Sequence, residues 1–158
     1  MEDPKVLADL FSRLGARHPE RWAKSQIEEG IPQLARYLFL RQAWKHVVDP
    51  NGDWIADSIT TENRDLPGGN IGPALNRIVA QGATHADINT IVRIKQWELL
   101  SRLCHLIDDP DLEEDEVKSI GWRLFLVNEN DEPIEIIPGL HESVLEVEPT
   151  GYEMRPAK

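Results

Sequence analysis

Residues 84–107 constrain the fold more than any other stretch, because they carry one uninterrupted helical pattern in the middle of the chain. Thr84 is a suitable N-cap, and Asp87 supplies the acidic half of a capping box. On a helical wheel of about 100° per residue, apolar side chains cover about half of the circumference. An apolar arc of this width is typical of a helix with neighbours on two sides, so the sequence predicts a long and largely buried central helix. The arc consists of Ile88, Val92, Trp97, Leu99, Leu100, Leu103, Cys104, Leu106 and Ile107.

Four further helices are predicted before the central one. Proline near the start and glycine after the end mark most of these segments, as expected for helix termini. The predicted helices cover residues 4–14, 19–29, 32–48 and 73–81. On the third of them, Arg36 and Arg41 are predicted to face solvent. Residues 54–72 form the least regular part of the chain, a partly ordered connection with one helical turn around Trp54 and Ile55.

A change of pattern after residue 108 indicates β-structure. The segments W-R-L-F-L-V and P-I-E-I-I, separated by N-E-N-D-E, predict a β-hairpin at about 121–137. A lone hairpin is marginal in water, so we expect it to pack on the helices. The predicted fold is therefore mainly α, of the α+β class. Four to five helices form a bundle around the central helix 84–107, and the C-terminal hairpin lies on one side.

The net charge of −11 is confined to the last third of the chain. Residues 1–107 contain 13 acidic and 13 basic side chains, whereas residues 108–158 contain 15 acidic side chains and four basic ones. A chain of 158 residues is expected to form a single globular domain. We place this domain at 1–148, with a neutral helical part at 1–107 and an acidic α/β-hairpin part at 108–148. A loosely ordered tail is expected at 149–158.

The acidic part predicts the chemistry of a partner. A surface of this charge repels phosphate backbones and attracts basic proteins. We therefore expect a non-catalytic protein–protein interaction module, for example an immunity or inhibitor protein that covers the cationic site of a nuclease-like toxin. A solvated, solubilising surface is the alternative explanation of the same charge. The residues predicted to contact a basic partner are Glu113, Glu114, Glu116, Glu129, Asp131 and Trp54.

A small-molecule-binding protein or an enzyme is a second hypothesis. Loops as long as residues 54–72 often line a site. Such a site would lie between this loop and the central helix, with His46, His85 or His141 beside a carboxylate. Cys104 lies within the apolar arc and is predicted to be an inert core residue. The sequence assigns no catalytic residue and no cofactor, and it favours a protein that is not an enzyme.

A helix-turn-helix DNA-binding protein is a third hypothesis. Residues 74–93 predict a helix, a turn and a second helix, which is the order that DNA-reading motifs use. Binding requires a basic face formed by Arg77, Arg93 and neighbouring residues. The charge of the chain has the wrong sign for phosphate contacts, so nucleic acid is not the expected partner.

No metal site, membrane segment or disulfide is expected. Asp49, Asn51 and Asp53 alternate like the first ligands of a calcium loop, but glycine falls at the fourth position, so a tight turn is the better interpretation. No apolar run approaches the length of about 20 residues that spans a membrane, and the N-terminus lacks the pattern of a signal peptide. One cysteine allows no internal disulfide and is consistent with a reducing compartment. We therefore expect a cytoplasmic protein.

Two stretches of the sequence resemble a known protein family. They are W-E-L-L-S-R-L-C-H-L-I-D-D-P at Trp97–Pro110 and the segment Gly121–Leu145, which contains G-W-R-L-F-L-V-N-E-N-D-E-P and P-G-L-H-E-S-V-L. Both are similar to a family of small acidic bacterial cytosolic proteins of unassigned function. The resemblance implies a bacterial cytosolic protein, and it transfers no catalytic residue to this chain.

Overall fold

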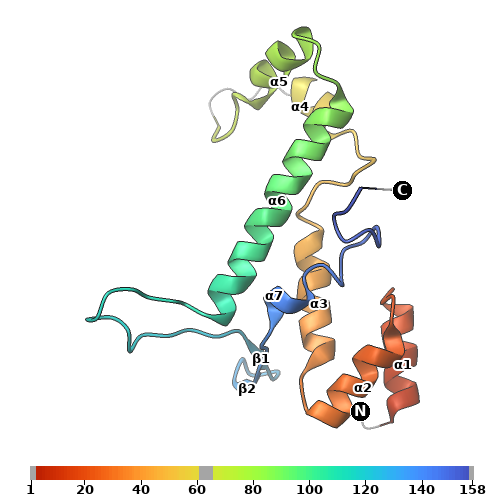
Figure 1. The fold of residues 1–158 in the computed structure, drawn as a ribbon, viewed down its shortest axis with the longest axis vertical. Helices are drawn as coiled ribbons and strands as arrows, with labels where there is room; N and C mark the ends of the chain where they lie inside the picture. The colour runs from red at the N-terminus through yellow and green to blue at the C-terminus, as the bar shows by residue number, and fades with distance from the viewer. Residues whose placement is uncertain (1–2, 61–65, 157–158) are drawn as a thin grey trace. The chain divides into compact units, whose positions relative to one another are not determined.

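The computed structural model describes residues 3–60 and 66–156 and contains, within them, seven helices and one two-stranded antiparallel sheet (Figure 1). The prediction of a mainly α fold with a C-terminal β-hairpin is confirmed. Among the described residues, no helix combines the length and the apolar character needed to cross a lipid bilayer. The elements are α1 (Pro4–Arg13), α2 (Pro19–Glu29), α3 (Gln33–Trp44), α4 (Trp54–Thr60), α5 (Ile71–Ala80), α6 (His85–Asp108), β1 (Phe125–Val127), β2 (Pro133–Ile136) and α7 (Leu140–Ser143).

The chain divides into two compact units. Unit 1 contains the described residues up to Lys45 and those from Leu99 onward, and unit 2 runs from His46 to Glu98. The charge pattern places a division at residue 107 instead. The two divisions differ because α6 continues from unit 2 into unit 1, and its last turns pack with the elements that follow it.

Local capping signals mark the starts of α1 and α6 as the sequence predicts. Asp3 caps α1, and its carboxylate accepts a hydrogen bond from the Lys5 backbone N–H at 2.8 Å. The predicted capping box of α6 is confirmed: Thr84 Oγ1 donates to the Asp87 carboxylate at 2.6 Å and accepts from the Asp87 N–H at 3.1 Å. At the other end of a helix the prediction is less accurate, since α3 stops at Trp44 and not at residue 48.

Three aromatic rings form the centre of unit 1. Phe11 from α1, Trp22 from α2 and Tyr37 from α3 lie with ring centroids 5.5 to 5.9 Å apart, and Tyr37 meets the other two edge-on. The segment after α7 closes this core, because the Trp44 indole N–H donates to the Val144 carbonyl at 2.8 Å. The other buried apolar side chains of unit 1 are Leu7, Ala23, Leu40, Cys104, Ile137, Leu140 and Val147.

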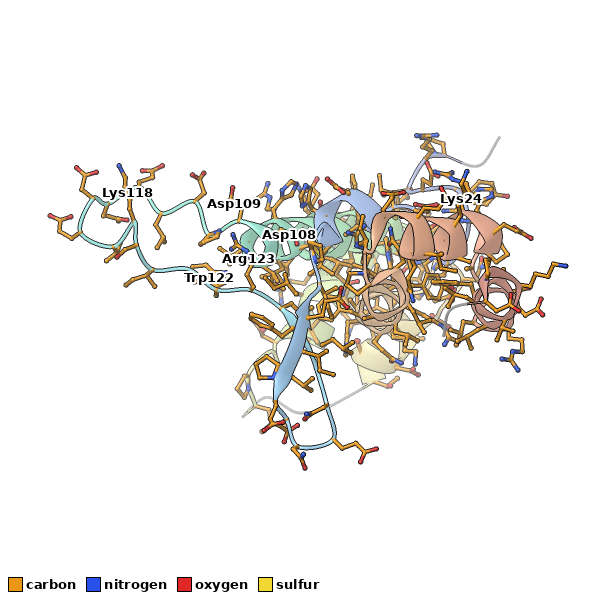
Figure 2. The ribbon with its side chains drawn as sticks, turned by 90° about the horizontal axis from the view of Figure 1, so that it is seen from below. Lys24, Asp108, Asp109, Lys118, Trp122 and Arg123 are labelled. Atoms are coloured by element: carbon orange, nitrogen blue, oxygen red, sulfur yellow. The ribbon has the colours of Figure 1, made fainter. Side chains whose placement is uncertain are left out.

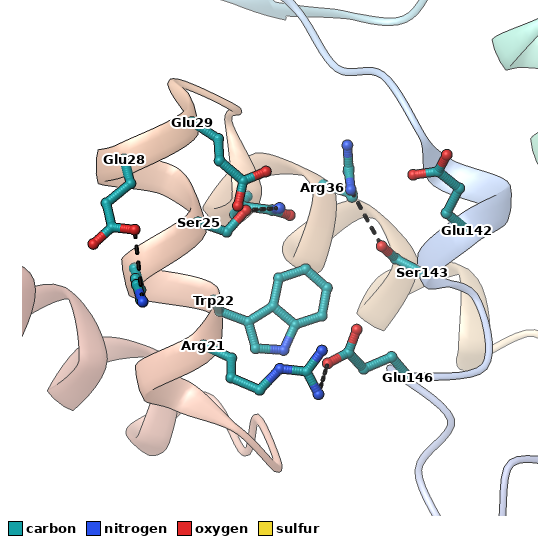
Figure 3. A pocket seen from close by; sticks show the side chains of 11 residues that line it. Arg21, Trp22, Ser25, Glu28, Glu29, Arg36, Glu142, Ser143 and Glu146 are labelled. Carbon is teal, nitrogen blue, oxygen red and sulfur yellow. Dashed lines mark hydrogen bonds and ion pairs between the residues drawn. The ribbon is translucent and has the colours of Figure 1, made fainter.

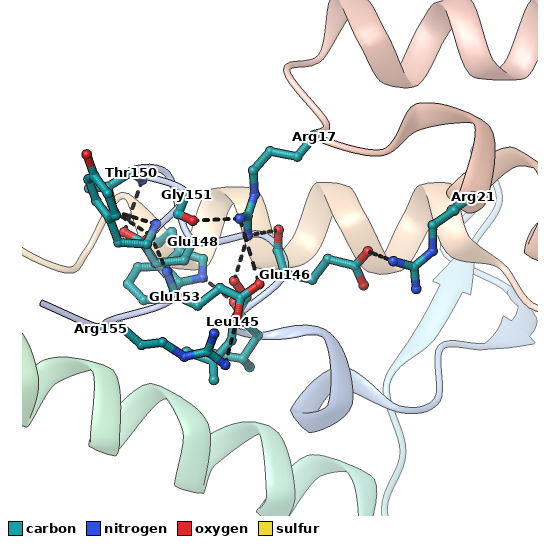
Figure 4. A network of polar contacts seen from close by, with 12 residues as sticks. Arg17, Arg21, Leu145, Glu146, Glu148, Thr150, Gly151, Glu153 and Arg155 are labelled. Atoms are coloured by element: carbon teal, nitrogen blue, oxygen red, sulfur yellow. Dashed lines mark hydrogen bonds and ion pairs between the residues drawn. The ribbon is translucent and has the colours of Figure 1, made fainter. Parts of the chain in front are cut away.

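Arg17 attaches the end of the chain to unit 1 (Figure 4). Its Nη1 donates to the Gly151 carbonyl at 2.8 Å, and its Nη2 donates to the carbonyls of Leu145 and Glu146 at 3.1 and 2.8 Å. Its guanidinium also lies 3.8 Å from the Glu153 carboxylate. Part of the segment predicted as a loosely ordered tail therefore makes specific contacts with the loop between α1 and α2.

Unit 2 has a small core to which α4, α5 and α6 each contribute one buried residue, namely Ile55, Leu75 and Ile88. α4 occupies the start of the stretch for which the sequence predicts only one helical turn. It approaches α5 so closely that a Cβ atom at Gly72 would lie 2.6 Å from the Ser58 carbonyl oxygen. Glycine at this position is therefore a packing requirement.

Asn89 on α6 organises the turn that precedes α4. Its side-chain nitrogen donates to the Asp49 carbonyl at 3.0 Å, and its side-chain oxygen accepts from the Trp54 indole N–H at 2.6 Å. The Asp49 carboxylate accepts from the Asn51 N–H at 2.7 Å, which is the tight turn predicted in place of a calcium loop. Residues 61–65, which belong to the predicted irregular loop, lie outside the described residues.

The expectation that α6 is largely buried is wrong. Cys104 is 1% exposed, but Leu99, Leu103 and Leu106 of the predicted apolar arc are 58, 46 and 45% exposed. In unit 1 the side of α6 that carries Cys104 is buried. The apolar arc is wider than this buried side, so part of the arc remains exposed to solvent. The same holds in unit 2, where Ile91 is 61% exposed.

Candidate functional site

The acidic loop, residues 109–120, joins α6 to the β-hairpin region without regular secondary structure. Two turns shape it: the Val117 N–H donates to the Glu114 carbonyl at 3.1 Å, and the Ile120 N–H donates to the Val117 carbonyl at 2.8 Å. Figure 2 shows the loop running from Asp109 out to Lys118, with side chains pointing outward along it. The carboxylates of this loop are therefore displayed to solvent rather than folded into the core.

Trp122 fixes the end of the acidic loop to the last turns of α6. Its indole N–H donates to the Leu106 carbonyl at 2.6 Å, which satisfies one of the carbonyls that a helix C-terminus leaves free. The indole nevertheless stays 40% exposed. An aromatic ring that is held in place and still reaches solvent is a common feature of protein interfaces.

The β-hairpin exposes apolar residues on its two strands. Phe125 of β1 pairs with Ile136 of β2, and every residue of both strands is exposed. Burial begins only beyond β2 at Ile137, whose N–H donates to the Leu124 carbonyl at 2.8 Å. The expectation that the strands bury themselves against the helices is therefore wrong, because every strand residue stays exposed.

The turn of the hairpin is built by its own side chains. The Asn128 side-chain oxygen accepts from the backbone N–H groups of Asn130 and Glu132 at 2.9 and 3.1 Å, and its nitrogen donates to the Glu132 carboxylate at 2.8 Å. Asp131 adopts a left-handed conformation with φ of 61°, which aspartate tolerates better than most residues. The exposed carboxylates of Glu129 and Asp131 are thus presented from a defined turn.

A cavity of about 310 Å³, the hairpin groove, lies between the hairpin and the start of α3. Leu126 and Glu135, which pair across the two strands, form one wall. Ile31, Leu34 and Leu38 form much of the other wall. The groove is lined mainly by aliphatic side chains and has a carboxylate beside it, so it suits an apolar side chain that is flanked by a basic one.

The structure divides the predicted partner-binding residues between the two units. Glu113, Glu114 and Glu116 are exposed on the acidic loop of unit 1, and the turn carboxylates described above belong to the same unit. Trp54 belongs to unit 2, where it is half-buried and its indole N–H is bound by Asn89. Its contact with a partner stays a prediction. The residue-by-residue prediction missed Trp122 and the hairpin groove, for which the only signal was apolar residues on both faces of the predicted strands.

A close histidine–carboxylate pair forms in unit 1. His141 Nδ1 lies 2.6 Å from Asp108 Oδ2, and the His141 N–H donates to the same oxygen at 2.9 Å. Ser143 Oγ accepts from Arg36 Nη1 at 3.3 Å and is buried. Burial, reinforced by Asp108, raises the pKa of the Cys104 thiol to about 12. Neither the Ser143 hydroxyl nor the Cys104 thiol is therefore positioned as a nucleophile beside the His141–Asp108 pair.

The other histidines named in the small-molecule hypothesis lie in unit 2. His85 Nδ1 is 3.6 Å from the Asp53 carboxylate, with both side chains exposed, and His46 is exposed. Across residues 3–60 and 66–156, no group of three or more histidine, cysteine, aspartate and glutamate side chains is arranged to hold a metal ion.

The helix, turn and helix expected for DNA binding are present as α5, residues 81–84 and α6. The basic face is not formed as predicted, because Arg93 is buried and its guanidinium donates to the Val48 carbonyl within unit 2. Arg77 is exposed on α5. The predicted pair thus leaves a single exposed arginine for phosphate contacts.

Comparison of this chain with protein-family models, with curated proteins and with solved structures finds no match.

Proposed function

We propose that this protein is a non-catalytic interaction module that binds a basic protein through the acidic loop and the β-hairpin of unit 1. The observation that carries the proposal is the combination of charge and apolar exposure on one continuous segment. Between residues 109 and 136, ten acidic side chains stand against Lys118 and Arg123. The same segment exposes Ile120, Trp122, Phe125, Leu126, Val127, Ile134 and Ile136.

The apolar residues distinguish this proposal from a merely solubilising surface. Carboxylates alone keep a protein soluble, but exposed aromatic and aliphatic side chains oppose that role. Such a mixture is typical of an interface in which a few apolar anchors supply affinity and surrounding charges set orientation and encounter rate. In our proposal the partner inserts an apolar side chain into the hairpin groove, and its lysines or arginines meet Glu129, Asp131 and the acidic loop.

A protein that itself binds nucleic acid has a cationic surface, which is what the carboxylates of the acidic loop require in a partner. The acidic loop presents closely spaced negative charges, as a phosphate backbone does, and can cover a cationic site. An inhibitor or immunity protein for a nuclease-like toxin is the specific form that we propose. The single cysteine and the resemblance to acidic bacterial cytosolic proteins support a cytoplasmic location.

The test uses the full chain as bait in a lysate of the native cell at low and moderate salt, followed by purification of any retained protein and measurement of its affinity. We expect a basic protein that is retained at low salt and released as the salt concentration rises. The variant Glu113→Lys with Glu114→Lys is expected to weaken binding at least about tenfold. The matched control, Asp9→Lys with Glu20→Lys, reverses two exposed carboxylates on α1 and α2 and is expected to bind as the wild type does.

Two outcomes contradict the proposal. One is equal affinity for the loop variant and the wild type, which would show that the acidic loop does not contact the partner. The other is equal weakening by the control variant, which would show a response to net charge alone.

A further inference from the structure

Unit 1 contains a second concave site, which is separate from the hairpin groove. A pocket of about 540 Å³ opens between α2, α3 and the α7 segment (Figure 3), a size typical of small-molecule sites. The Trp22 indole is among the side chains that line it, together with polar side chains from all three segments. We refer to it as the Arg36 pocket. Nothing in the proposed interaction through the hairpin uses it.

Arg36 and Gln33 sit on one face of α3, one helical turn apart, and line this pocket. They are 5 and 6% exposed. Gln33 Nε2 donates to Ser25 Oγ at 2.7 Å, but Gln33 Oε1 has no hydrogen-bond partner among the described residues. Arg36 Nη1 donates to Ser143 Oγ, and Arg36 Nε has no acceptor within the same part of the chain. Buried polar groups are nearly always hydrogen-bonded, so these two atoms indicate a missing partner.

The unpaired Nε of Arg36 constrains the shape of that partner. Arginine presents its Nε–H and one terminal N–H side by side, in a fork that matches the two oxygens of a carboxylate. Burial lowers the pKa of Arg36, and the nearby Glu142 opposes this most strongly. Arginine side chains nevertheless remain protonated in proteins. No ion pair within 4.0 Å fixes this charge among residues 3–60 and 66–156.

The rim of the pocket carries the opposite charge. Lys24 is 3.7 Å from Glu28, and Arg21 is 4.0 Å from Glu146, so these cations already have partners. The remaining carboxylates that line the pocket belong to Glu29 and Glu142, which are both exposed. A dianion such as phosphate would be repelled by this rim, and a simple amine would be repelled by Arg36.

We propose that the Arg36 pocket binds a small zwitterion of the free amino-acid class. The carboxylate of the ligand meets the Arg36 guanidinium, and its ammonium group lies near Glu29, Glu142 and the Gln33 side-chain oxygen. The lining carries four carboxylates and three cations, so a basic amino acid complements it better than a neutral one. The indole of Trp22 supplies an apolar wall for the side chain of the ligand.

Gly139 shows how tightly this end of the pocket is built. A Cβ atom at this position would lie 2.7 Å from Arg36 Nη2 and 2.9 Å from Glu142 Oε2, and its φ of 68° favours glycine. Arg36 and Glu142 therefore both reach the same backbone position. The competing arrangement is a direct closure of Glu142 onto Arg36, which would fill the carboxylate position without any ligand.

The experiment titrates the full chain with L-arginine, glycine, acetate and methylammonium, by calorimetry and by the indole N–H signals in ¹H–¹⁵N spectra. We expect L-arginine and glycine to bind, with L-arginine tighter, and the Trp22 signal to shift in the wild type. Acetate and methylammonium are expected to bind at least about tenfold more weakly than glycine, because each meets only one half of the site.

Variants separate the two halves of the pocket. Arg36→Gln is expected to weaken glycine binding at least about tenfold, and Glu29→Gln is expected to weaken the binding of the amino acids but not that of acetate. Arg41→Gln, an exposed arginine on the same helix, is the matched control. Because Arg36→Gln can impair folding, circular dichroism accompanies it and Glu29→Gln serves as the independent test.

Three results overturn the proposal. They are acetate binding as tightly as glycine, absence of a Trp22 shift with any amino acid, and unchanged glycine affinity in Glu29→Gln. The second is the result expected if Glu142 closes onto Arg36 permanently. None of these results bears on the acidic loop, whose test measures a protein partner.

Discussion

The aromatic core of α1–α3 and the β-hairpin use the same residue types in opposite ways. Phe11 and Trp22 are 0 and 5% exposed, whereas Phe125 and Trp122 are 43 and 40% exposed. The core residues come from three helices that pack together, whereas every residue of the two hairpin strands is exposed. Residue type alone therefore does not determine which side chains are buried in this protein.

The energetic consequence of this difference is large. Full burial of a phenylalanine contributes about 1.5–3 kcal/mol from area alone. An exposed cross-strand pair such as Phe125 with Ile136 contributes about 0.2–1 kcal/mol. The hairpin consequently adds little to the free energy of unfolding, and an isolated two-stranded sheet is marginal in water. Contact of its apolar residues with another protein is the proposal that the following variants test.

The variant Phe11→Ala should give the largest effect. It removes a fully buried ring that contacts both Trp22 and Tyr37, and we expect it to lower the free energy of unfolding by about 3–5 kcal/mol. Denaturant titration followed by tryptophan fluorescence measures this loss. Val6→Ala on the same helix is the matched control, since Val6 is exposed and should change stability little. A loss below about 1 kcal/mol in Phe11→Ala would contradict the packing described for unit 1.

The Cys104 thiol gives the next largest effect, which depends on pH. Its pKa is raised to about 12 in the folded protein, so the stability gained from the neutral thiol is present below its ordinary pKa and is lost as pH rises toward 12. We expect the wild type to lose up to about 1.4 kcal/mol per pH unit more than Cys104→Ala in this window. Comparing pH slopes cancels the contributions of other groups. A thiol reagent should also label native Cys104 far more slowly than the unfolded chain, and equal labelling rates would contradict its burial.

Local sequence signals predicted the helices well, because caps and terminal prolines act over a few residues. Asp3 and the Thr84–Asp87 box do what their sequence positions indicate. Burial was harder to predict, because it depends on which distant segments arrive. Arg36, expected on the solvent-facing side of α3, is buried because the α7 segment, about 100 residues later in the sequence, packs there.

The candidate site was predicted only where it depends on local sequence, and not where it depends on contacts between distant segments. The negative charge of the acidic loop was evident from the sequence, and its carboxylates are exposed, as a partner-binding surface requires. The hairpin groove could not be predicted from the sequence, because Leu126 and Leu34 lie in segments far apart in the chain and only folding brings them together. The sequence predicted that the hairpin packs on the helices, because a lone hairpin is marginal in water, whereas every residue of its strands is exposed.

The smallest expected effect on stability belongs to Phe125→Ala, and it tests the comparison most directly. The side chain is paired only across the hairpin, so its removal should lower the free energy of unfolding by at most about 1 kcal/mol. If the hairpin binds the proposed basic partner, the same change should reduce the binding free energy by more than about 1 kcal/mol, as removal of an interface anchor does. Denaturant titration and affinity measurements on one preparation give both numbers. A large loss of stability with unchanged affinity would show that the hairpin belongs to the core after all, whereas the reverse pattern assigns its exposed residues to a partner.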